Sequence, residues 1–149
     1  MENFNEIEIS KILKEFRERT GILYSNLFTA DGFIIAVDQA NMGEDTQIFE
    51  SIGAVYASLF ALAEQGVKTI NEEHYINHIS IQAGNQLDSD SFMIILELVN
   101  IDIIISTIFP IFANFGVIHF ELTQIIQKLR KYFSGGEKLM DTESLSTLE

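Results

Sequence analysis

The chain has 149 residues and a formal net charge of −13, with 22 acidic residues against 9 basic ones, and 47% of its residues are hydrophobic. This length predicts a single domain with a substantial core. An excess of negative charge repels phosphate backbones and anionic lipid surfaces, so nucleic acid is excluded as a partner. The chain has no cysteine, which excludes disulfides, thiolate metal sites and thiol nucleophiles.

The N-terminal sequence and the hydropathy pattern carry no signal for export or for membrane insertion. MENFNEIEIS lacks the basic and apolar regions of a secretion signal. No uninterrupted apolar run reaches the roughly 18 residues that a transmembrane helix needs. The nearest candidate, residues 101–115, is interrupted by polar residues and by Pro110. We therefore expect a cytoplasmic protein without direct membrane insertion.

The first third of the chain predicts a helix followed by a hairpin. Residues 4–19 have apolar side chains at helical spacing, and Gly21 is placed to end that helix. Strands are predicted at residues 22–28 and 33–37, on either side of Asp31-Gly32, a dipeptide typical of hairpin turns. A polar loop then leads into a long helix, with Asp45 as the expected cap and Gly66 as the expected end.

The rest of the chain predicts three strands and a last helix. Residues 67–75 are polar and irregular. In the strand at 76–83, Ile79 and Ile81 alternate with polar residues, which indicates a sheet edge or one wet face. Strands at 91–99 and 101–109 are apolar through their centres, and Pro110 ends the second. A helix from 113 or 114 to about 133 is predicted to end at Gly135, so that a domain of residues 1–134 precedes an acidic, disordered tail of residues 135–149.

The predicted order of elements is therefore α-β-β-α-β-β-β-α. Short connections favour antiparallel hairpins, and continuously apolar strands need cover on both faces. We predict an α+β fold with three layers, α/β/α. Its middle layer is a five-stranded antiparallel sheet, with two helices on one face and the third helix on the other.

The middle helix has more apolar surface than one sheet contact requires. On a helical wheel, residues 48–65 have an apolar arc of about 180°, whereas packing on a sheet needs a little over ~100°. The aliphatic sector is expected to lie on the chain's own sheet; its members are Ile48, Ile52, Val55, Leu59 and Leu62. The aromatic and small sector is expected to face a second subunit, because small residues permit close approach and aromatic rings anchor interfaces.

The predicted dimer interface combines that second sector with the edge strand. Its members are Phe49, Gly53, Tyr56, Ala57, Phe60, Ile79 and Ile81. Pairing of two edge strands across a two-fold axis would protect both of them. The alternative is a monomer in which the terminal segments of the same chain bury the middle helix.

Motifs that carry chemistry are missing or weak. The sequence contains no GxxxxGK[ST], GxGxxG or GxSxG pattern. His74 and His78 are four residues apart, a spacing that suits a metal only on a helix, yet they lie at the start of a predicted strand. The run Asp88-Ser89-Asp90 resembles the start of a calcium loop but lacks its glycine and its distant glutamate. We predict no catalytic residues, no metal and no cofactor.

Taken together, these segments resemble the Roadblock/MglB family, which is related to roadblock-type dynein light chains. GILYSNLFTADGFIIAV, residues 21–37, resembles the first hairpin of that family. IFESIGAVYASLFALAEQG, residues 48–66, resembles its central dimerisation helix. SFMIILELV, IDIIISTIF and ANFGVIHFELTQIIQKL resemble its last two strands and its closing helix.

The resemblance implies a roadblock/profilin-like fold and a specific function. It implies dimerisation through the central helix and the third strand, either with a second copy or with a related roadblock chain. It also implies a non-catalytic platform that binds and regulates or scaffolds a small Ras-like GTPase. The alternative is a small-ligand-sensing domain of longin, profilin-like or sensory type. The sequence alone shows no polar groups that converge on such a ligand, so this hypothesis ranks second.

Overall fold

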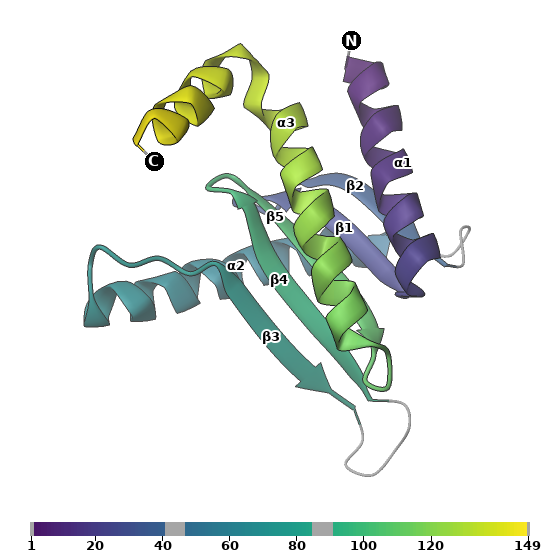
Figure 1. Cartoon of the computed structure of the whole chain (residues 1–149). Helices are drawn as coiled ribbons and strands as arrows, with labels where there is room; N and C mark the ends of the chain where they lie inside the picture. The colour runs from purple at the N-terminus through teal and green to yellow at the C-terminus, as the bar shows by residue number, and fades with distance from the viewer. Residues whose placement is uncertain (1, 41–46, 85–90, 149) are drawn as a thin grey trace.

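The computed structural model describes the backbone of residues 2–40, 47–84 and 91–148, and the side chains of residues 6–40, 51–84 and 91–134. The expected cap Asp45 and the Asp88-Ser89-Asp90 turn lie outside these ranges. The predicted order of elements is confirmed (Figure 1); the elements are α1 (Glu2–Thr20), β1 (Tyr24–Thr29), β2 (Ile34–Gln39), α2 (Gln47–Ile70), β3 (His78–Ala83), β4 (Phe92–Asn100), β5 (Ile103–Pro110) and α3 (Phe115–Leu148).

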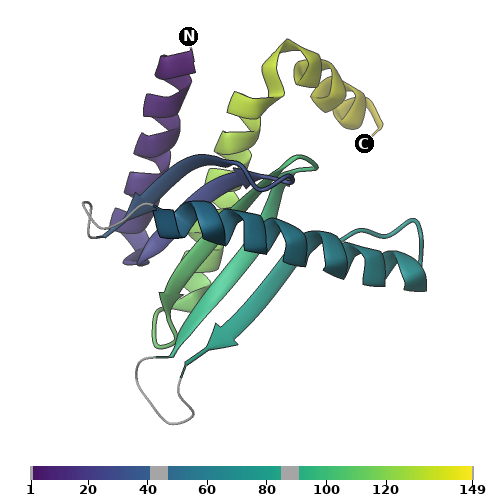
Figure 2. The ribbon, with the colours of Figure 1, turned by 180° about the vertical axis from the view of Figure 1, so that it is seen from behind.

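The strands form one five-stranded sheet in the order β2-β1-β5-β4-β3. Every neighbouring pair is antiparallel. Figures 1 and 2 show α1 and α3 on one face of this sheet and α2 across the other. The predicted α+β fold with three layers is therefore confirmed, and so is the position of β3 at a sheet edge.

The central strands are covered on both faces, which explains their continuous apolar runs. In β4, Ile95 belongs to the core under α1 and α3, whereas its neighbour Leu96 belongs to the core under α2, and each is 0% exposed. In β5, Ile105 and Ile104 divide in the same way. A strand with two buried faces has no position left for an alternating polar residue.

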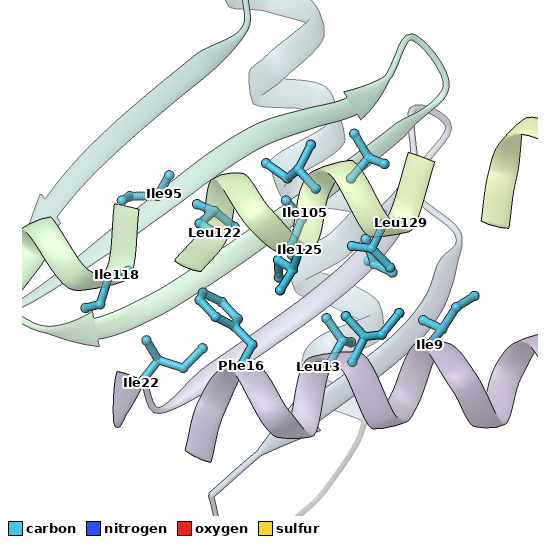
Figure 3. Packing of buried hydrophobic residues seen from close by; sticks show 14 of the residues in the cluster. Ile9, Leu13, Phe16, Ile22, Ile95, Ile105, Ile118, Leu122, Ile125 and Leu129 are labelled. Atoms are coloured by element: carbon cyan, nitrogen blue, oxygen red, sulfur yellow. The ribbon is translucent and has the colours of Figure 1, made fainter. Parts of the chain in front are cut away.

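The larger core lies between the sheet and the pair α1–α3. Figure 3 shows Leu13 and Phe16 of α1 and Leu122 and Ile125 of α3 directed into the same space above the sheet. These positions follow the helical spacing seen in the sequence, because residues three and four apart share a helix face. Full burial of each such side chain contributes about 1.5–3 kcal/mol, so this packing dominates the stability of the domain.

Charged side chains fasten α1 to its neighbours around this core. The Nε of Arg17 donates a hydrogen bond to Oδ2 of Asp38 in β2 at 2.6 Å, and the Asp38 residue is only 6% exposed. Arg19 lies 3.6 Å from Glu121 of α3. A buried carboxylate without its partner is strongly destabilising, so Arg17 has a structural role in positioning α1 on β2.

Gly21 ends α1 as the sequence predicts, with φ of 74° and an N–H that donates to the Arg17 carbonyl at 2.8 Å. The predicted ends at Gly66 and Gly135 are wrong, because α2 continues to Ile70 and α3 continues to Leu148. Residues 67–70, predicted as irregular, are therefore helical. Among the described glycines Gly66 is not one with positive φ, and a glycine that keeps helical angles does not stop a helix.

The C-terminal part of α3 changes direction in Figure 1 and leads away from α1. The division of the chain into a domain of residues 1–134 and a tail of residues 135–149 stays a prediction.

Two glycine substitutions test this account in opposite directions. Gly32 has φ of 95°, and a Cβ there would lie 2.9 Å from the Cα of Ala54, so Gly32→Ala should lower the free energy of unfolding by about 1–3 kcal/mol. A Cβ on Gly66 would meet nothing within 4 Å, so Gly66→Ala should raise it by about 0.5–1 kcal/mol. Urea unfolding measures both values. A destabilised Gly66→Ala variant would contradict the continuous α2.

Candidate functional site

The inner face of α2 is aromatic. Tyr56, Ala57 and Phe60 are 8%, 5% and 4% exposed. They pack in one cluster with the sheet residues Phe28, Ile94, Leu96, Ile104 and Ile108. The rings of Phe28 and Tyr56 lie 6.3 Å apart in a tilted arrangement. The aromatic sector of α2 is thus part of the chain's own core, beneath the helix as it crosses the sheet in Figure 2.

The small residues of α2 serve a close approach within the chain. A Cβ on Gly53 would lie 2.6 Å from Cδ1 of Ile34 and 3.3 Å from the carbonyl oxygen of Gly32. A Cβ on Gly32 would in turn lie 2.9 Å from the Cα of Ala54. The helix therefore crosses the tip of the β1–β2 hairpin at a distance that larger side chains would prevent.

The structure divides α2 differently from the two predicted sectors: Ile52 and Leu59 pack on the chain's own sheet as expected, whereas Val55 and Leu62 are exposed. Gly53, Tyr56, Ala57 and Phe60 face the chain's own sheet and hairpin, so they are not available to a partner in this arrangement. The remaining predicted member from α2, Phe49, lies where side chains are not described. Aromatic rings bury more area than aliphatic side chains, and a helical wheel gives the width of an apolar arc but not which part of it faces the sheet.

The aliphatic sector is the one left at the surface. Val55 is 62% exposed and Leu62 is 65% exposed, while Ile52 and Leu59 are half-buried against the α2 core. Exposed aliphatic side chains spaced seven residues apart lie on one side of a helix. This stripe, formed by Ile52, Val55, Leu59 and Leu62, is called the aliphatic stripe below.

The edge strand β3 presents both an apolar and a polar face. Ile79 and Ile81 are half-buried and pack against the same core as Ile52 and Leu59. The N–H of Leu98 donates to the Asn77 carbonyl at 3.1 Å, so Asn77, Ile79 and Ile81 make the ladder bonds to β4. The N–H and C=O of His78, Ser80 and Gln82 consequently point outward, away from β4. Such an edge is a template for a further strand.

The polar face of β3 carries a short hydrogen-bond chain. Nδ1 of His78 lies 2.9 Å from Oε1 of Glu97, and its Nε2 lies 2.5 Å from Oγ of Ser80. This network holds the His78 ring against β4 and accounts for that histidine. In the described part of the chain, no three His, Asp or Glu side chains are grouped to hold a metal ion. None of the helices described is long and apolar enough to cross a membrane.

Comparison with solved structures places this architecture in a known class of folds. The gliding protein MglB from Thermus thermophilus is 16% identical, with a TM-score of 0.72 and coverage of 86% of this chain and 90% of that one. An MglB with a tetrameric arrangement is 16% identical, with a TM-score of 0.72 and coverage of 86% and 89%. A Roadblock/LC7 domain from Streptomyces avermitilis is 14% identical, with a TM-score of 0.69 and coverage of 83% and 96%.

The chain therefore has the α+β fold of the roadblock domains. Within that class its fold is similar to MglB over most of both chains, as the residues of the first hairpin and the closing helix led us to expect. No family model and no curated protein matches the sequence.

Burial of Tyr56 makes a testable contribution to stability at high pH. Desolvation raises the pKa of Tyr56 above its ordinary value of 10.0. As the pH rises, this phenol ionises in the unfolded chain before it ionises in the folded protein. Its contribution to the free energy of unfolding is therefore fully present below pH 10 and is lost as the pH rises toward the folded pKa. The free energy of unfolding should fall more steeply above pH 10 in the unmodified protein than in Tyr56→Phe.

The measurement is urea unfolding at a series of pH values from about 9 to 11, the range in which tyrosine titrates. Tyr75→Phe is the matched control, because it removes the same hydroxyl group from a side chain that is 60% exposed. Parallel profiles for the unmodified protein and Tyr56→Phe would show that the Tyr56 phenol is not desolvated.

Proposed function

We propose that two copies of this chain form a dimer through the aliphatic stripe of α2 and the open edge of β3. The observation that carries this proposal is the exposure of Val55 and Leu62, 62% and 65%, on a helix whose other apolar side is already buried. Ile79 and Ile81 of β3 extend the same apolar region, because they share a core cluster with the half-buried members of the stripe. Burial of exposed aliphatic surface drives association.

Pairing of the two β3 strands sets the relative orientation of the two copies in this interface. The outward N–H and C=O groups of His78, Ser80 and Gln82 can pair with the same groups of a second β3 in antiparallel register, which joins the two sheets into one. Residues that pair directly opposite each other lie on the same face of a sheet. Ile79 and Ile81 of both copies would then lie beside both α2 helices. A related roadblock chain with the same edge can replace the second copy.

The dimer is inferred to be a cytoplasmic, non-catalytic platform for a small Ras-like GTPase, which it regulates or scaffolds. The fold shared with MglB and with the Roadblock/LC7 domain supports this inference, together with the family resemblance of the hairpin and the central helix. The mechanism is differential binding: a surface that contacts the switch segments in one nucleotide state stabilises that state.

The dimer is tested by light scattering at micromolar concentration. We expect twice the chain mass of 16.9 kDa for the unmodified protein and 16.9 kDa for Val55→Glu/Leu62→Glu. Ser80→Pro should also give a monomer, because it removes an outward N–H without removing a ladder bond to β4. Phe120→Glu is the control, since Phe120 is 61% exposed and belongs to α3, the helix on the other face of the sheet from α2. A monomeric unmodified protein would exclude the interface, as would equal dissociation by Phe120→Glu.

The partner is tested with the Ras-like GTPases of the same genome, each loaded with GDP or with a GTP analogue. We expect one GTPase to bind the dimer at least about tenfold more tightly in one nucleotide state, because only a differential affinity can shift its states. Calorimetry measures both affinities. The dimer-breaking variant of α2 is included to show whether binding needs both copies. Equal binding of both nucleotide states would remove regulation and leave a scaffold, and no binding would contradict the proposal.

A further inference from the structure

A hollow of about 690 Å³ lies beside α3, at the end of the sheet where β4 leads into β5. Its walls come from three places far apart in the sequence: α3, strand β4 with the turn that follows it, and the segment before β3. Its lining includes Glu97, Val99, Asp102, Gln127, Arg130 and Tyr75. A volume of this size is typical of small-molecule sites. The aliphatic stripe and the outer edge of β3 do not line it.

One wall of the hollow carries an anchored guanidinium group. The Nε of Arg130 donates a hydrogen bond to the carbonyl oxygen of Val99 at 2.7 Å. That bond fixes the plane of the guanidinium and leaves its two terminal amino groups for other acceptors. No carboxylate of the described side chains forms an ion pair with Arg130. In a chain with 22 acidic residues, a positioned arginine without an acidic partner is a candidate for binding an anion from outside.

The hollow also contains two carboxylates that Arg130 does not reach. Glu97 is held by His78, with 2.9 Å between Nδ1 and Oε1. Asp102 lies in the β4–β5 turn, and among the described residues its carboxylate takes part in no ion pair. Opposite charges thus line one hollow, and no ion pair among the described side chains joins them.

This arrangement selects the kind of molecule that fits. A simple anion would be attracted by Arg130 but repelled by Glu97 and Asp102. A simple cation would be attracted by the two carboxylates but repelled by Arg130. A molecule that carries both charges is complementary to this mixed lining. Tyr75 and Ile101, which are 60% and 82% exposed, line the same hollow and provide apolar surface for the remainder of such a molecule.

We propose that this hollow is a binding site for a zwitterionic α-amino acid. Its carboxylate is bound by the terminal amino groups of Arg130, its ammonium group by Asp102, and its side chain lies against Tyr75 and Ile101. This inference is independent of the dimer and of the GTPase, because the hollow is lined neither by the aliphatic stripe nor by the outer edge of β3.

The first test uses the full-length protein and each of the twenty L-amino acids, followed by amide chemical shifts in NMR. At least one amino acid should shift the signals of residues 97–102 and 123–130 in a saturable way. The amide and the N-acetyl derivative of that amino acid each lack one charge, and each should bind about 10–100-fold more weakly. If no amino acid shifts these signals, or if either derivative binds as well as the parent, the dipolar site is disproved.

The second test uses variants and the amino acid identified in the first. Arg130→Gln and Asp102→Asn should each weaken binding by about 10–100-fold. Lys131→Gln is the matched control, because it removes the same charge one residue away and lies outside the hollow. Arg130→Gln removes a contact between α3 and Val99 and can fail to fold for that reason. Asp102 is exposed, so Asp102→Asn should fold and still tests the site. Equal loss in Lys131→Gln, or none in Asp102→Asn, would overturn the assignment.

Discussion

Burial of the two central strands on both faces is the constraint on which the rest of this structure depends. Ile95 and Leu96 are consecutive and fully buried on opposite sides, and Ile104 and Ile105 repeat this in β5. One layer of helices cannot cover both faces, so α2 must lie opposite α1 and α3. The sheet is wider than α3 alone covers, which leaves β3 at an open edge and the polar side of β4 accessible beside the helix.

The two faces of the sheet consequently have different properties. The α1–α3 face has the larger core, and its polar border is made of side chains fixed by hydrogen bonds, such as Arg17 with Asp38 and Arg130 with the Val99 carbonyl. The α2 face has a smaller core and an aliphatic stripe that is only partly buried. An apolar surface without a cover suits association with another chain, whereas fixed polar groups around a hollow suit a small ligand.

Local sequence patterns predicted the helices and strands well, because the interactions that form these elements join residues that are close together in the chain. The alternation around Ile79 and Ile81 marks a half-covered strand, and Gly21 adopts the left-handed angles that end a helix. Gly66 failed as a stop signal because helical angles are open to glycine when the next residues continue the helix. The faces of α2 were misassigned because the decisive contact, Gly53 against Ile34, joins segments that only the tertiary structure brings together. The hollow could not be predicted from the sequence for the same reason, because Glu97, Asp102 and Arg130 form no motif along the chain.

The register of the sheet determines where the residues around the hollow lie. A shift of β5 against β1 by two residues would keep every side chain on its own face of the sheet. Asn26 and Ser106 lie directly opposite each other in β1 and β5, both 0% exposed, and the Ser106 hydroxyl donates to Oδ1 of Asn26. A shift would leave that oxygen and that hydroxyl buried without a partner, at about 1–3 kcal/mol for each. The pair therefore fixes β5 against β1, and with it the turn that carries Asp102 and the start of α3. The positions of Arg130 and Asp102 around the hollow depend on a polar pair in the middle of the sheet that touches neither of them.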